Sequence, residues 1–194
     1  MDRETITTGD LRLRPFEEAD IAWVHRVSLD PMVQKYLQLP IPYQRSDAEH
    51  FVREMCVAAW DSGTRAEFVV ESAVAAGGSA SADAISADGR LRLGRVGLGL
   101  DRVGGGELGY WMDPAARGRG VATAAVRALC GWAFGSLGLG LVEWRAEVGN
   151  GASRRVAEKV GFTVEAVLRQ RLVHRGVRVD VWVGSMLPSE LPAG

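Results

Sequence analysis

The fold is decided by one stretch of sequence, Glu107-Leu108-Gly109-Tyr110-Trp111-Met112-Asp113-Pro114-Ala115-Ala116-Arg117-Gly118-Arg119-Gly120-Val121-Ala122. Its first six residues are apolar or strand-forming. They end at an Asp-Pro pair, where a strand stops because proline cannot donate a hydrogen bond to a ladder. Apolar residues at helical spacing begin directly after the glycines. The stretch therefore predicts a strand, a turn with two glycines and two arginines, and then a helix.

The turn at residues 117–120 is suited to a pyrophosphate. A helix start offers unpaired N–H groups and the positive end of the helix dipole, and glycine lets a ligand approach the backbone closely. The turn is not a P-loop, because no Gly-Lys-Ser/Thr follows the glycines. It is not a dinucleotide-binding fingerprint either, because Thr123 occupies the third glycine position.

The spacing Arg117-x-x-Gly120-x-Ala122 resembles the acetyl-coenzyme A pyrophosphate loop of the GNAT superfamily of N-acetyltransferases, whose pattern is Gln/Arg-x-x-Gly-x-Gly/Ala. Downstream, Asn150 is followed three residues later by Ser153, and a short helix closes with Gly-Phe, as in the same superfamily. The preceding strand looks like the Glu-hydrophobic-Gly-Tyr-Trp strand of the branch that acetylates ribosomal-protein N-termini. The three segments occur in the superfamily's order.

The resemblance implies an α+β fold of the GNAT type, built like an α/β/α sandwich. Its sheet is expected to be mixed, mostly antiparallel and seven-stranded, with helices on both faces. A chain of 194 residues that is 47% hydrophobic and 24% charged fits one globular domain. We expect a single N-acetyltransferase domain over residues 1–194, with a core at about 11–187. Residues 73–90 are rich in Ala, Ser and Gly and are expected to form a lengthened, mobile hairpin loop.

Hydrophobic periodicity and turn residues predict the elements along the chain. The helix over 46–63 is expected to begin with a capping box formed by Ser46 and Glu49. Arg12 and Arg14 are expected on the solvated face of the first strand. The expected helices are 17–30, 46–63, 118–136 and 152–160, and the expected strands are 11–16, 65–72, 91–101, 107–112, 140–148, 162–174 and 177–187.

Composition excludes several classes of function. The net charge of −1 gives no strong attraction to nucleic acid or anionic membrane. Cys56 and Cys130 fall within helical patterns and are expected to be core residues, and no cluster has metal-ligand spacing. We expect the polar N-terminus not to act as a signal peptide, and the uncharged run at 128–142 is too short to cross a bilayer. We expect a soluble, cytoplasmic protein without a metal.

The resemblance implies acetyl-CoA as the acetyl donor, with main-chain N–H groups near the end of the 107–112 strand binding the pantetheine arm. It also puts Asn150 on the cofactor and Ser153 close to the sulfur, which Ser153 would protonate. Both residues also occur as helix caps alone, but their spacing and position together favour the role at the cofactor. Many superfamily members use a tyrosine as this acid, and residues 156–158 offer none. The residues expected to bind the cofactor are Trp111, Met112, Arg117, Gly118, Arg119, Gly120, Val121, Ala122, Asn150 and Ser153.

Two carboxylates compete for the role of the base that assists amine deprotonation. By analogy with the family, Glu107 lies near the acetyl group, although it could be a solvated charge or a strand-holding ion pair. Glu67 is the second choice, although a charge near a strand end is ordinarily solvated. His174 could reach an acceptor but is expected to be solvated. The role of Asp180 stays open.

The expected reaction is direct transfer, in a ternary complex, to a primary amine, first of all a protein N-terminus of the ribosomal type. One alternative is a small-molecule acceptor such as an aminoglycoside or polyamine. A polycationic aminoglycoside would call for an acidic acceptor cleft. Another is a non-catalytic acetyl-CoA-binding regulatory protein. The acceptor site would be covered by the region around residues 32–43, where Trp23, Tyr36 and Tyr43 could line it. A monomer or a homodimer is expected.

Overall fold

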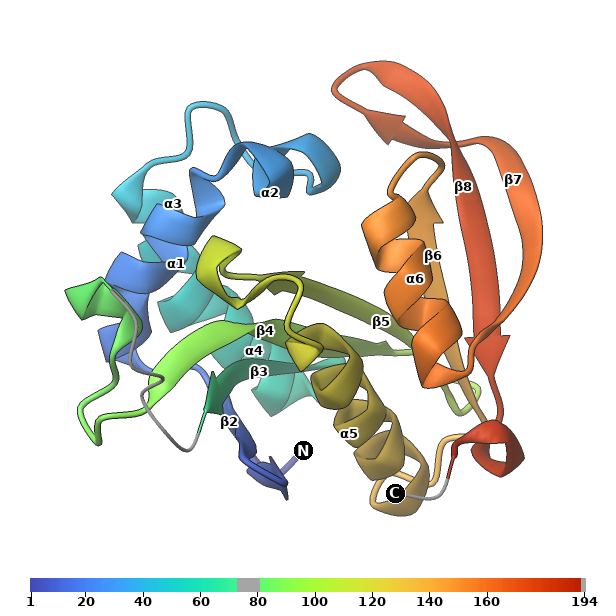
Figure 1. The fold of residues 1–194 in the computed structure, drawn as a ribbon, viewed down its shortest axis with the longest axis horizontal. Helices are drawn as coiled ribbons and strands as arrows, with labels where there is room; N and C mark the ends of the chain where they lie inside the picture. Colours follow the sequence, from blue (N-terminus) through green and yellow to red (C-terminus); the bar gives the residue numbers. More distant parts are fainter. Residues whose placement is uncertain (73–80, 193–194) are drawn as a thin grey trace.

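The computed structural model describes residues 1–72 and 81–192. All the strands in these ranges belong to one eight-stranded sheet with the order β1-β2-β3-β4-β5-β6-β8-β7 (Figure 1). Only β5 and β6 run parallel, so the sheet is mixed and mostly antiparallel, as predicted. The strands are β1 (Ile6–Thr8), β2 (Leu11–Pro15), β3 (Arg65–Ser72), β4 (Leu91–Leu100), β5 (Gly105–Met112), β6 (Leu141–Glu147), β7 (Thr163–His174) and β8 (Val177–Met186).

The prediction of seven strands is wrong by one, because β1 adds an edge strand to β2. Its three residues, Ile-Thr-Thr, are too few for an alternating pattern to stand out in the sequence. The remaining seven strands lie where the sequence predicts them, to within two residues at each end. The fold class is confirmed.

Helices cover both faces of the sheet, as neighbouring side chains of β5 demonstrate. The Trp111 ring lies 5.0 Å from the ring of Trp23 on α1, whereas the Tyr110 hydroxyl reaches Ser153 on α6. Successive side chains of a strand point to opposite faces, so α1 and α6 lie on opposite sides. The helices are α1 (Ile21–Ser28), α2 (Pro31–Tyr36), α3 (Arg45–His50), α4 (Cys56–Ser62), α5 (Val121–Gly135) and α6 (Gly151–Val160).

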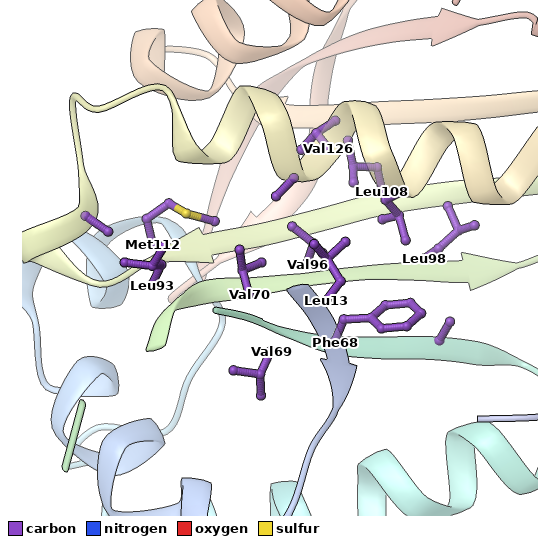
Figure 2. Packing of buried hydrophobic residues seen from close by; sticks show 14 of the residues in the cluster. Leu13, Phe68, Val69, Val70, Leu93, Val96, Leu98, Leu108, Met112 and Val126 are labelled. Atoms are coloured by element: carbon purple, nitrogen blue, oxygen red, sulfur yellow. The ribbon is translucent and has the colours of Figure 1, made fainter. Parts of the chain in front are cut away.

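The core lies between the sheet and these helices, and Figure 2 shows its centre. Leu13, Phe68, Val96 and Leu98 are fully buried, and Val126 of α5 covers the same face. Burying such side chains is worth about 1.5 to 3 kcal/mol each. Consecutive residues of β3 and β4 are buried on both faces, because helices cover both sides of the sheet.

The helical segment after residue 44 differs from its prediction in two respects. It begins at α3, whose N-cap is Gln44 and whose capping box pairs Gln44 with Asp47, so the predicted Ser46–Glu49 box is wrong. It also contains a π-helical stretch, Phe51–Met55, between α3 and α4. Helical periodicity identifies the segment but does not distinguish two capping pairs that lie two residues apart.

Arg14 does not lie on a solvated face. Its side chain is 5% exposed and donates hydrogen bonds to Asp20 at 2.8 Å and to Glu71 at 2.6 Å. Both carboxylates are fully buried, and Arg92 joins the network through Asp20 at 2.7 Å. The alternation of apolar and basic residues in this strand predicts a solvated basic face. It does not reveal Glu71, which lies 57 residues away in sequence and pairs with Arg14.

The Ala/Ser/Gly-rich segment lies partly outside the described residues, which omit 73–80. Its described part, 81–90, packs against the domain, since Ala84 is buried and Asp83 accepts a hydrogen bond from Arg26 of α1 at 2.7 Å. This part connects β3 to β4, which pair as a hairpin, and the mobility of the segment stays a prediction.

Candidate active site

The site begins where β5 and β6 separate. Their parallel pairing ends at Leu108 with Trp144, although β5 continues to Met112 and β6 to Glu147. Beyond that point β5 pairs only with β4, and β6 only with β8. The two strands thus diverge into a wedge, visible between β5 and β6 in Figure 1. Main-chain groups at residues 109–112 on the wedge side have no partner strand in the described chain.

A cavity of about 680 Å³ occupies this wedge. It is the size of pocket that takes a small molecule or a cofactor arm. Its lining contains nine of the ten predicted cofactor residues; Arg119 is the exception. The nine are Trp111, Met112, Arg117, Gly118, Gly120, Val121, Ala122, Asn150 and Ser153.

The turn before α5 has the backbone that a pyrophosphate site needs. Gly118 and Gly120 have φ of 74° and 80°, in the left-handed region that favours glycine. Gly120 is the N-cap of α5 and has no side chain to accept from the first helical N–H groups. The N–H groups of residues 121–123 therefore remain available at the positive end of a 15-residue helix.

Contacts with α2 and with the end of β5 fix the position of the Arg117 side chain. Its guanidinium pairs with Asp30, the N-cap of α2, at 2.6 Å, and also donates to the carbonyl of Met112 at 3.2 Å. Asp30 has a pKa below its ordinary value: burial would raise it, but the Arg117 hydrogen bond and the N–H groups of α2 lower it. Arg117 thus ties α2 to the end of β5. The lining includes two other cationic side chains of α6, Arg155 and Lys159, which the sequence analysis did not single out.

Ser153 lies at the centre of a hydrogen-bonded group. Its Oγ accepts from Trp144 Nε1 at 3.0 Å and lies 3.0 Å from the Tyr110 hydroxyl. Asn150 is the N-cap of α6 and accepts from the Ser153 N–H at 3.2 Å, so its capping role is real. Because the indole nitrogen can only donate, the Ser153 proton is directed to Tyr110 or into the cavity. Burial raises the pKa of Tyr110 to about 12, which keeps the phenol neutral.

Of the two predicted bases, Glu107 lines the cavity and Glu67 does not. The Glu107 carboxylate is half exposed and pairs with Arg145 of β6 at 3.5 Å. Glu67 is 3% exposed and accepts from Arg95 Nε at 2.6 Å and from Arg65 at 2.5 Å. The expectation that a charge in this position is solvated is wrong, because Arg65 of the same strand and Arg95 of the neighbouring strand β4 surround it.

The far end of the cavity is enclosed by α2 and the β7–β8 hairpin. Tyr36 of α2 lines it and donates to the carbonyl of Gly149 at 3.3 Å. Trp23 and Tyr43 are buried and do not line it. His174 is also buried, at 7% exposure, and its Nδ1 lies 2.8 Å from Glu147, so the expectation that it is solvated is wrong. His174 ends β7 at the hairpin tip, and this tip is tied to α2 and the residues after it by Gln38 and Arg175.

Asp180 has a structural role in this hairpin. Its carboxylate accepts from the N–H of Gln170 at 2.8 Å, and Gln170 has a φ of 51° at a break in the β7–β8 register. A carboxylate that receives this N–H stabilises a bulge whose backbone group would otherwise be unpaired.

Metal ligands and free thiols do not contribute to the cavity. Within residues 1–72 and 81–192, no group of three or more His, Cys, Asp or Glu side chains could hold a metal ion. Cys56 and Cys130 are buried and unpaired, as predicted, and burial raises the pKa of Cys130 to about 12. No helix within the same ranges is both long and apolar enough to cross a bilayer.

Comparison with known proteins identifies the family. Residues 10–163 match the model of the acetyltransferase (GNAT) domain. The chain belongs to the GNAT family.

Among curated GNAT relatives, the putative ribosomal N-acetyltransferase YdaF of Bacillus subtilis is 40% identical over 105 residues, which cover 53% of this chain and 57% of the relative. The chain spans about half the length of the curated relatives it matches. The structure of Mycobacterium smegmatis RimJ in complex with CoA-disulfide superposes with a TM-score of 0.82 at 22% identity, covering 99% of this chain and 91% of that one. Spermidine N-acetyltransferase from Vibrio cholerae, in complex with CoA and spermine, gives a TM-score of 0.74 at 20% identity, covering 94% and 98%.

The glycine turn before α5 gives a first prediction, for the substitution Gly120→Ala. Alanine at a φ of 80° costs about 1–2 kcal/mol, and relief of that strain would turn the N–H groups of residues 121–123 away from a bound pyrophosphate. We expect CoA to bind about tenfold more weakly, measured by calorimetry. The matched control is Gly138→Ala, which strains a glycine with φ of 65° outside the cavity lining. Equal loss of CoA affinity in both variants would contradict a direct role for the turn.

Proposed function

We propose that the protein is an acetyl-CoA-dependent N-acetyltransferase that transfers acetyl directly to a primary amine in a ternary complex. The observation that carries the proposal is the wedge itself. One cavity brings together the main chain of residues 109–112, the glycine turn before α5 and the Ser153 hydroxyl. A single N-acetyltransferase domain is proposed because the described strands form one sheet.

The chain's groups match the three requirements of acetyl transfer. Acetyl-CoA supplies the acetyl group as a thioester. Main-chain N–H groups of residues 109–112 polarise the thioester carbonyl, and Glu107 assists removal of the amine proton. Ser153 donates a proton to the departing thiolate. Tyr110, hydrogen-bonded to Ser153, holds this hydroxyl in place; Ser153 then regains a proton from solvent, to which Glu107 releases the proton of the amine. Glu107 is preferred to Glu67 because Glu67 is buried between two arginines.

For the acceptor we propose a protein N-terminus of the ribosomal-protein type. The cavity lining carries two carboxylates, Glu107 and Glu147, against the five cationic side chains of Arg117, Arg145, Arg155, Lys159 and Arg171. A polycation with three or more ammonium groups would meet net repulsion there, whereas a peptide brings one α-ammonium group to the reacting end and can place a further basic side chain beside a single carboxylate. The name of the YdaF relative supports the ribosomal acceptor, and the spermidine acetyltransferase neighbour is the reason to test a polyamine beside it. The cytoplasmic location and the oligomeric state stay predictions.

The testing experiment measures thiol release from acetyl-CoA with ribosomal-protein N-terminal peptides, aminoglycosides and polyamines. We expect release with the peptides and about a tenfold lower kcat for Glu107→Gln, since that change removes the cavity carboxylate but keeps its shape. Glu143→Gln, on the facing strand but outside the lining, is the control. Thiol release with polyamines alone would make a polyamine, and not a protein N-terminus, the acceptor. Tight CoA binding without release to any acceptor would favour the non-catalytic alternative.

A further inference from the structure

The hydrogen-bonded pair of Glu147 and His174 is not used in the reaction described above. Glu147 is the last residue of β6, and its side chain is 22% exposed and lines the cavity. His174 is the last residue of β7 and brings its Nδ1 within 2.8 Å of a Glu147 oxygen. Residues that are 27 apart in sequence thus meet at the cavity wall.

The pair lies on the face of the sheet opposite the Ser153 group. Along β6, Trp144 points to Ser153 of α6, so the alternating Arg145 and Glu147 point to the other face. That face carries α1, whose Trp23 contacts Trp111. On the same side, α2 and the residues after it hold the hairpin tip, because Gln38 donates to the carbonyl of Val173 and Arg175 donates to the carbonyl of Gln34. An acceptor that enters from this side would pass Glu147.

The Glu147 carboxylate has His174 as its side-chain partner within the described chain. Nε2 of His174 is buried and has no hydrogen-bond partner among the described residues. Nδ1 is therefore the polar contact that fixes the orientation of the ring and of the Glu147 carboxylate. Within the described chain, Glu147 forms no ion pair with any arginine or lysine, whereas Glu107 already pairs with Arg145.

Distance along the strand separates Glu147 from the reacting atoms. Ser153 Oγ is anchored on Trp144, and Glu147 lies three residues further along β6, which is roughly 10 Å at the usual rise. An extended peptide covers that distance in about three residues. A carboxylate at this separation meets the side chain of an early acceptor residue, and it is too distant to meet the reacting amine itself.

We propose that Glu147, oriented by His174, is a subsite for a second cationic group on the acceptor, namely a basic side chain two or three residues from the acetylated N-terminus. The inference rests on the proposed function and deepens it, since it defines which N-termini the protein prefers. His174 is a positioning residue and Glu147 a specificity-determining one.

The test uses peptide acceptors that are identical except for arginine or citrulline at the second or third residue. Citrulline keeps the shape of arginine and removes its charge. We expect wild-type kcat/KM to be at least tenfold higher for the arginine peptide. In Glu147→Gln this ratio should fall to within about twofold of unity, through loss of activity on the arginine peptide alone. Unchanged activity on the citrulline peptide shows that the variant is folded and catalytically intact.

The role of His174 is tested by the same ratio, which a merely structural defect would not change. His174→Asn, whose amide can replace the Nδ1–H donor, should keep the preference, and His174→Ala should lose most of it. Glu165→Gln, on β7 and outside the cavity lining, is the control that should keep the wild-type ratio. A wild-type protein that acetylates peptides without preferring arginine, or a Glu147→Gln variant that keeps the preference, overturns the inference. Absence of transfer by the wild type to any acceptor overturns the proposed function and the inference with it.

Discussion

Replacement of Ser153 by alanine is expected to lower kcat about 100-fold while CoA affinity stays within a few-fold of wild type. The reason is geometric. Ser153 Oγ receives a hydrogen bond from Trp144, and its own proton is directed either to Tyr110 or into the cavity. Alanine removes the only part of the side chain that can donate to a thiolate, but leaves the backbone N–H that Asn150 caps.

Two companion variants sharpen this prediction. Tyr110→Phe removes the phenol next to Ser153 and should cost about tenfold in kcat, less than Ser153→Ala, if serine is the immediate donor. Ser185→Ala, which alters a β8 serine bonded to Glu165 outside the cavity lining, should leave kcat unchanged. Rapid-mixing measurement of CoA thiol release checks all three. If Ser153→Ala kept the wild-type kcat, or if Tyr110→Phe lost more kcat than Ser153→Ala, then Ser153 would not be the group that protonates the thiolate.

The elements of this site were predictable because their signals are local. Pro114 ends β5, Gly120 begins α5, and Gly161 ends α6 with a φ of 114°; each acts through its own backbone. The residues expected to hold the cofactor therefore gather in one cavity, with the exception of Arg119. Local backbone chemistry is the part of a fold that sequence reveals most directly.

Most of the missed features of the site depend on partners that are distant in sequence. Tyr110 was expected to be a strand residue, and its meeting with Ser153 depends on how α6 packs against β5. The pairing of His174 with Glu147 and the contact of Glu67 with Arg95 likewise follow from strand register, whereas Arg65 reaches Glu67 from two residues away on the same strand. A charged residue in a strand looks solvated until the opposing strands supply counter-charges.

The same principle underlies the largest expected effect on stability, which is at Asp20. We expect Asp20→Ala to lower the free energy of unfolding by about 3–5 kcal/mol, because it leaves buried guanidinium groups without their carboxylate. Asp20 is fully buried and accepts from Arg14 at 2.8 Å, from Arg92 at 2.7 Å and from the N–H of Glu17 at 2.8 Å. Urea unfolding followed by tryptophan fluorescence measures the change. Asp61→Ala, which removes an exposed ion pair with Arg3, should have no measurable effect.

The pH dependence of stability gives an independent check on the same residue. Burial alone would raise the pKa of Asp20, but the hydrogen bonds and charges of Arg14 and Arg92 lower it below its ordinary value. A carboxyl with a lowered pKa in the folded state stabilises fully above its unfolded pKa of about 3.9, and this contribution is lost as pH falls toward the folded value. Wild-type stability should therefore decline below about pH 4, and Asp20→Asn should decline less over the same range. Equal acid sensitivity of the two proteins would mean that other carboxyls, such as Glu71 in the same network, govern acid unfolding.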